Sequence, residues 1–149
     1  MPRRLQRDGP GDSGVRLSPS EDSLFKWTAE LDGPPDTPFA GATFRLAIQV
    51  PNAYPMAPPA VRFCTPCFHP NVHWRSGEIC LDILKTAWSP AWGLQSTMTA
   101  VVALLGDPAG GADSPLNCDA GNLLRAGDEV GFASLARLFA VEHAGAPSD

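Results

Sequence analysis

The clearest strand pattern in the chain is Phe44-Arg45-Leu46-Ala47-Ile48-Gln49-Val50. Its large apolar side chains recur at every second position, which is the period of a strand that buries one face. The same alternation runs through residues 24–31, and a third, shorter strand is predicted over residues 61–64, after a cluster of prolines. Three successive strands with short connections predict an antiparallel meander.

Beyond residue 93 the apolar period becomes helical. The spacing predicts a helix over residues 94–105, a short one over 119–126 and a last one from about residue 128, and glycines follow the first two. The residues expected on the buried face of the last helix are Phe132, Leu135, Ala136, Phe139 and His143. Strands first and helices afterwards is the α+β pattern, in which the helices pack against an antiparallel sheet.

The chain has 149 residues, 44% of them hydrophobic, and this size suits a single compact domain. Residues 1–20 are rich in Gly and Pro and show almost no apolar periodicity, so we predict that they form a flexible arm. We predict one core domain over residues 21–149.

Charge and hydropathy exclude several classes of protein. The formal net charge is −5, and the basic residues are scattered along the chain, which argues against nucleic acid or an anionic membrane surface as the main partner. The longest apolar run, residues 100–105, is far shorter than a membrane-spanning helix requires. The N-terminus lacks the apolar segment of a secretory signal, so we expect a soluble cytoplasmic protein.

Residues 65–93 contain no long regular element, and a segment of that size inside a compact domain is usually functional. Cys80 lies within it, flanked by apolar residues and then by Glu78 and Asp82, with no Lys, Arg or His within four positions. A protease nucleophile would need a paired histidine to hold it as a thiolate. The setting suits a thiol that accepts an already activated acyl group, because thioester exchange needs no strong base.

Asn71 is the candidate oxyanion donor for such an acyl transfer, because a side-chain amide can stabilise the tetrahedral intermediate. Two alternatives remain open at this point. Asn71 could be a turn former whose amide bonds nearby backbone. Cys80 could be a buried, inert thiol.

Several ordered motifs together resemble a ubiquitin-conjugating enzyme over residues 21–144. They are Tyr54-Pro55-x-x-Pro58-Pro59, His69-Pro70-Asn71, the run Gly77 to Leu84 around Cys80, and Trp88-Ser89-Pro90-Ala91. Residues 77–92 and 114–125 are most similar to the peroxisomal class, which modifies the peroxisomal import receptors. The resemblance implies the α+β fold of that family and an ATP-dependent conjugation pathway.

The resemblance also implies a role for each matching residue. Cys80 would carry ubiquitin as a thioester, and Asn71 would stabilise the oxyanion or hold the loop that does so. Ser114, with its neighbour Asp113, matches the gate position that orients and desolvates the incoming nucleophile. The residues expected to bind a ligase are Met56, Ser89, Pro90 and Ala91, and those expected to shape the loops are His69, Pro70 and Trp88.

The implied partners are ubiquitin, the ubiquitin-activating enzyme, a RING-type ligase and a peroxisomal membrane anchor protein. The implied location is the cytosol, at the cytosolic face of the peroxisome. The acceptor would be a lysine or a cysteine of the target. No cofactor and no metal are expected.

Residues 1–20 depart from the family pattern, which normally begins with an amphipathic helix. Glycines and prolines interrupt that region here, so we expect the helix to be truncated or missing. This keeps open a catalytically inactive, ubiquitin-binding adaptor of the same fold. A zinc-binding module is a second alternative, because Cys64 and Cys67 have metal-knuckle spacing and His69, His73 and Cys80 could complete a ligand set; we expect Cys64 to pack at a strand end instead.

Overall fold

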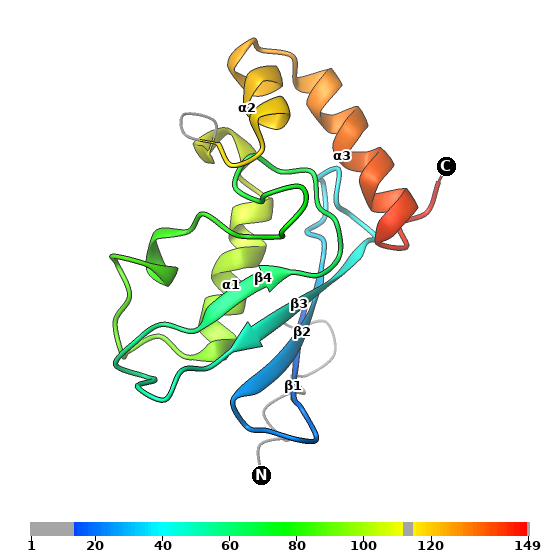
Figure 1. Ribbon diagram of the computed structural model, residues 1–149. Helices are drawn as coiled ribbons and strands as arrows, with labels where there is room; N and C mark the ends of the chain where they lie inside the picture. Colours follow the sequence, from blue (N-terminus) through cyan, green and yellow to red (C-terminus); the bar gives the residue numbers. More distant parts are fainter. Residues whose placement is uncertain (1–13, 112–114, 149) are drawn as a thin grey trace.

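The computed structural model describes residues 14–111 and 115–148. One antiparallel sheet organises these residues, with its strands in sequence order, β1-β2-β3-β4 (Figure 1). The strands are Val15–Pro19 (β1), Lys26–Asp32 (β2), Thr43–Gln49 (β3) and Ala60–Phe63 (β4). The predicted meander is therefore confirmed, with one strand more than expected.

The additional strand, β1, lies in the region predicted to be a flexible arm, and for residues 15–19 that prediction is wrong. Val15 and Leu17 are buried while Arg16 faces solvent, where its guanidinium binds both carboxylate oxygens of Asp32 at 2.8 and 2.9 Å. Only two buried apolar positions mark the strand, which is too short a pattern to detect. The predicted arm over residues 1–13 and the predicted loss of an N-terminal helix lie outside the described residues.

Buried side chains alternate with more exposed ones along β3, as the sequence predicted, and the buried ones are part of the core. Phe44, Leu46 and Ile48 of β3 are buried, and the side chains between them point to the other face. Leu46 pairs with Ala29 on β2 and with Phe63 on β4, so the buried positions of three strands lie in one row. The strand predicted from residue 24 begins two residues later, and Phe25 is 48% exposed.

The α-helices follow the sheet in sequence: Leu94–Leu105 (α1), Cys118–Arg125 (α2) and Glu129–His143 (α3), with short 3-10 turns at Asp82–Leu84 (η2) and Pro108–Gly111 (η3). Helix α1 packs against β1 and β2 through Met98, Val101 and Leu105, whereas α2 and α3 pack together at one end of the molecule (Figure 1). Each helix occupies the predicted region within one or two residues. The α+β class is confirmed.

Helix α3 buries a narrower face than the periodicity predicted. Phe132, Ala136 and Ala140 form the buried stripe, and Phe68 packs against Phe132 with ring centroids 5.8 Å apart. Leu135 is 37% exposed, and His143 is also exposed, so those two expectations were wrong. The buried residues are spaced by four, and Leu135 lies at the edge of that stripe.

None of the helices among the described residues is long and apolar enough to cross a membrane.

Candidate active site

Backbone hydrogen bonds, rather than regular elements, shape the irregular segment that contains Cys80. Isolated antiparallel bridges join Val72 to both His69 and Ile79, and another joins Arg62 of β4 to Glu78. Gly77 closes this hairpin with a φ of 78°, and its N–H donates to the carbonyl of His73. A Cβ at residue 77 would lie 1.9 Å from the Phe63 carbonyl oxygen, so only glycine fits there.

Asn71 and Cys80 are joined directly. The Asn71 side-chain Nδ2 donates to the Cys80 carbonyl oxygen at 3.0 Å, and the Cys80 N–H donates to the Asn71 carbonyl oxygen at 2.8 Å. The turn-former alternative for Asn71 was therefore partly right, because the amide bonds backbone, but that backbone belongs to Cys80. Asn71 Oδ1 is buried and has no hydrogen-bond partner among the described residues.

His69 connects this loop to helix α1. Its ring is fully buried, Nε2 lies 2.8 Å from the Leu104 carbonyl oxygen, and Nδ1 accepts the Asn71 N–H at 3.0 Å. Since Nδ1 accepts, Nε2 carries the proton and donates to Leu104. Burial lowers the pKa of His69 to about 4, so the ring is neutral at pH 7.

The four cysteines differ in accessibility. Cys67 is buried, and burial raises the pKa of its thiol well above the ordinary value. Cys80 is partly exposed, so the buried, inert thiol predicted as an alternative is not what the structure has. Cys64 and Cys118 are exposed, which corrects the expectation that Cys64 packs at a strand end.

The structure does not support the zinc-binding alternative in residues 14–111 and 115–148. No group of three or more His, Cys, Asp or Glu side chains there could hold a metal ion. Cys64 is exposed whereas Cys67 is buried, and both nitrogens of the His69 ring already make hydrogen bonds. The zinc module has no support in this part of the chain.

The segment that leads into α2 is hydrogen-bonded to the residue that precedes Asn71. The carbonyl oxygen of Pro70 accepts the N–H groups of Leu116 and Asn117, at 2.8 and 3.1 Å. Pro70, one of the residues expected to shape the loops, is buried. The predicted gate residues Ser114 and Asp113 lie outside the described residues.

Sequence reasoning missed Asn117. Its Oδ1 accepts the Ala120 N–H at 3.1 Å and so caps α2, and its side chain is only 3% exposed. A signal was present in the sequence, because Asn directly before an eight-residue helix is a preferred N-cap.

The predicted ligase-binding residues lie on two loops that one tryptophan ties together. Trp88 Nε1 donates to the Pro55 carbonyl oxygen at 2.9 Å, and the Trp88 ring packs against that of Tyr54 with centroids 6.0 Å apart. Met56 is 74% exposed beside this junction. Pro90 and Ala91 are exposed and Ser89 is partly exposed, with Ser89 Oγ accepting the Ala91 N–H. The structure thus brings all four residues to loops that share one anchor.

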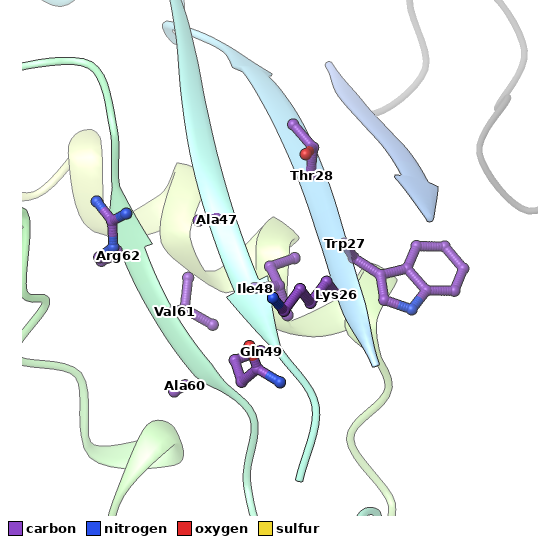
Figure 2. Close-up of a pocket in the computed structure, with 9 residues that line it drawn as sticks. All are labelled: Lys26, Trp27, Thr28, Ala47, Ile48, Gln49, Ala60, Val61 and Arg62. Carbon is purple, nitrogen blue, oxygen red and sulfur yellow. The ribbon is translucent and has the colours of Figure 1, made fainter. Parts of the chain in front are cut away.

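The surface has a shallow depression beside the Cys80 loop and another on the sheet. One borders the Cys80 loop, and the residues that line it include Pro58, Pro59, Glu78, Ile79 and Leu84. The other, shown in Figure 2, crosses β2, β3 and β4 on the sheet and is lined by residues such as Lys26, Gln49 and Arg62. The sheet depression contains no predicted site residue.

Comparison with known proteins identifies the relatives of this chain. The family model described as "Ubiquitin-conjugating enzyme" matches residues 4–140. Protein PEROXIN-4 of Arabidopsis thaliana is 53% identical over 92% of this chain and 86% of its own length. Ubiquitin-conjugating enzyme E2 pex4 of Dictyostelium discoideum is 52% identical over 84% of this chain and 83% of its own length.

Among solved structures, the H. polymorpha ubiquitin-conjugating enzyme Pex4p, in complex with the soluble domain of Pex22p, is similar with a TM-score of 0.87. It is 36% identical and covers 95% of this chain, and the alignment covers 90% of Pex4p. The E2 domain of a Toxoplasma gondii ubiquitin-conjugating enzyme follows with a TM-score of 0.82 and 32% identity, over 88% of each chain.

Proposed function

This chain belongs to the ubiquitin-conjugating enzyme family, and on that premise we propose that it accepts ubiquitin on Cys80 as a thioester and transfers it to a target protein. The donor is the ubiquitin-activating enzyme, and a RING-type ligase assists the transfer. The pairing of Cys80 with Asn71 is the single observation that supports this most directly.

The loading step is a thioester exchange. The sulfur of Cys80 attacks the C-terminal carbonyl carbon of ubiquitin, a new C–S bond forms, and the C–S bond to the activating enzyme breaks with release of its thiol. Cys80 is partly exposed, so its sulfur can reach a partner, unlike that of buried Cys67. ATP is consumed by the activating enzyme, and the comparisons support no ATP binding by this chain.

In the discharge step an amine or thiol of the target attacks the same carbonyl carbon, and Cys80 leaves as the thiol. The tetrahedral intermediate carries an oxyanion that a positioned donor stabilises. One N–H of the Asn71 amide holds the Cys80 carbonyl, and an amide nitrogen carries two. We propose that the first fixes the loop and that the second faces the oxyanion, with Ser114 and Asp113 orienting the acceptor.

The ligase surface is formed by Met56, Ser89, Pro90 and Ala91. Trp88 supports it, because a hydrogen bond from its indole and a ring contact hold the loop of Met56 against the loop of residues 88–92. An exposed methionine beside rigid loops is an adaptable apolar contact for a partner protein.

The target that we propose is a peroxisomal import receptor, modified at the cytosolic face of the peroxisome. The similarity to PEROXIN-4 and to pex4 supports this assignment. We also propose a peroxisomal membrane anchor protein as a partner, and the solved complex of the relative Pex4p with the soluble domain of Pex22p supports a partner of this kind.

The experiment that tests the function is a loading assay with activating enzyme, ATP and ubiquitin, resolved by non-reducing electrophoresis. We expect a thiol-sensitive adduct with the parent chain and with Cys118→Ala, and none with Cys80→Ala. Cys80→Ser should instead form an oxygen ester that survives thiol treatment. A folded parent chain that forms no adduct would support the adaptor alternative instead.

A further inference from the structure

Two buried side-chain polar atoms in the described part of the chain have no hydrogen-bond partner there, and they are of opposite kinds. Asn71 Oδ1 is an acceptor, and Asn117 Nδ2 is a donor. Buried amide groups are rarely left unpaired, because desolvation without a partner costs free energy. An acceptor and a donor left over in one neighbourhood are complementary.

Existing hydrogen bonds fix the orientation of both amides. Asn71 must present its nitrogen to the Cys80 carbonyl, which cannot donate, so Oδ1 is left over. Asn117 must present its oxygen to the Ala120 N–H, so Nδ2 is left over. Neither amide can be turned over without breaking a bond that the fold uses.

The backbone brings the two residues together. The carbonyl oxygen of Pro70, which directly precedes Asn71, accepts the Asn117 N–H at 3.1 Å. The Asn117 side chain is 3% exposed and faces the interior from the start of α2. The leftover donor and the leftover acceptor are therefore carried by segments that already share a hydrogen bond.

We propose that Asn117 is a positioning residue for the transfer reaction, with its Nδ2 supplying the donor that Asn71 Oδ1 lacks through one ordered water molecule that bridges the two amides. This rests on the proposed function, in which the second N–H of Asn71 faces the oxyanion. Fixing the oxygen of the Asn71 amide fixes the plane of the amide and therefore the direction of that N–H.

The test uses Asn117→Asp, which keeps an oxygen to cap α2 and replaces the Nδ2 donor by a carboxylate oxygen that accepts. The matched control is Asn122→Asp, the same change at an exposed position of the same helix. In a single-turnover assay of ubiquitin discharge to free lysine, we expect Asn117→Asp to load normally and to discharge about tenfold more slowly, as expected for one lost buried hydrogen bond. Asn122→Asp should behave as the parent chain.

A double-mutant cycle separates positioning from a general effect on folding. If Asn117 acts through Asn71, then Asn117→Asp should slow discharge no further in an Asn71→Ala background. An equal loss of rate in both backgrounds would overturn the proposal, and so would discharge of the single Asn117→Asp variant at the rate of the parent chain.

A measurement on the unloaded protein keeps this proposal separate from the proposed function. We expect the Asn71 Nδ2 protons, followed by NMR, to exchange with solvent at least several-fold faster in Asn117→Asp than in the parent chain or in Asn122→Asp. If the parent chain does not load, the proposed function fails while this exchange still tests the contact. Unchanged exchange would overturn the contact even if the parent chain loads.

Discussion

Asn71 and Cys80 hold each other by two hydrogen bonds in opposite directions, from the Asn71 side chain to the Cys80 carbonyl and from the Cys80 N–H to the Asn71 carbonyl. The thiol therefore sits on backbone whose position depends on one amide side chain. His69 supports Asn71 in turn, because its ring accepts the Asn71 N–H and donates to the last turn of α1. A chain of hydrogen bonds thus connects α1 to the proposed nucleophile.

Replacing Asn71 by Ala removes a donor to Cys80 and the proposed oxyanion donor together. We expect loading with ubiquitin to persist and single-turnover discharge to slow by roughly 10²-fold, the usual loss for one oxyanion donor. The thermal midpoint should also fall, since one net hydrogen bond contributes about 1 kcal/mol. Asn122→Ala is the control on an exposed asparagine, and discharge of Asn71→Ala at the parent rate would remove Asn71 from the mechanism.

The buried neutral His69 predicts a loss of stability in acid. Its pKa is about 4 in the folded chain against an ordinary value of 6.5, so the unfolded state binds the proton first as the pH falls. The stability that depends on a neutral His69 is fully present above about pH 6.5 and is lost as the pH falls toward 4. The free energy of unfolding should therefore fall by about 2 kcal/mol between pH 7 and pH 5. Urea denaturation at both pH values measures it.

His69→Gln should flatten this pH dependence, whereas His143→Gln, at an exposed position, should leave it as in the parent chain. If His69→Gln loses as much stability as the parent between pH 7 and pH 5, another group is responsible.

Gly77 is required by contact as well as by conformation. Gly77 and Gly127 share a φ of 78°, but an added Cβ at residue 77 would meet the Phe63 carbonyl oxygen, whereas at residue 127 it would meet nothing within 4 Å. Both Ala variants bear the strain of positive φ, on the order of 1 kcal/mol. We expect Gly77→Ala to lose at least about 2 kcal/mol more than Gly127→Ala in chemical denaturation, because backbone must shift. Equal losses would show that the hairpin yields at no cost.

Trp88→Phe keeps an aromatic ring and removes the indole donor to Pro55. We expect the loop of Met56 to loosen, with a loss of about 1 kcal/mol in stability. With a RING domain that accelerates discharge of the parent chain, the ratio of the assisted to the unassisted discharge rate should be smaller in Trp88→Phe. The control is Trp74→Phe, because Trp74 is an exposed indole that is 55% accessible. If the ratio of the RING-assisted to the unassisted discharge rate is the same in Trp88→Phe as in the parent chain, Trp88 does not support the ligase surface.

Periodicity was sufficient to predict most of the fold, because β2, β3 and the three α-helices carry repeated apolar positions. It failed at β1, where two buried residues in five give too short a signal and the pairing with β2 decides. Periodicity also predicted that Leu135 is buried. Residues at the edge of an apolar helix face are buried only where a neighbouring element covers them.

The sequence suggested candidate residues for the site, which stay a prediction, but not the contacts between them. Short motifs identified Cys80, Asn71, His69 and Trp88, but spacing alone could not show that the Asn71 amide would bond the Cys80 carbonyl. The N-cap position of Asn117 could be predicted, but its link to the site could not, because its N–H bonds the carbonyl of Pro70, 47 positions earlier in the chain. Contacts of that range arise from the folded backbone.

A chain in which Cys80 is the only cysteine shows whether Cys80 carries ubiquitin. Cys64→Ser, Cys67→Ala and Cys118→Ser combined leave that single thiol. After incubation with activating enzyme, ATP and ubiquitin, intact mass spectrometry should find one ubiquitin per chain, removed by a reducing thiol. A folded single-cysteine chain that acquires no such adduct, while the parent chain acquires one, would contradict the assignment of Cys80.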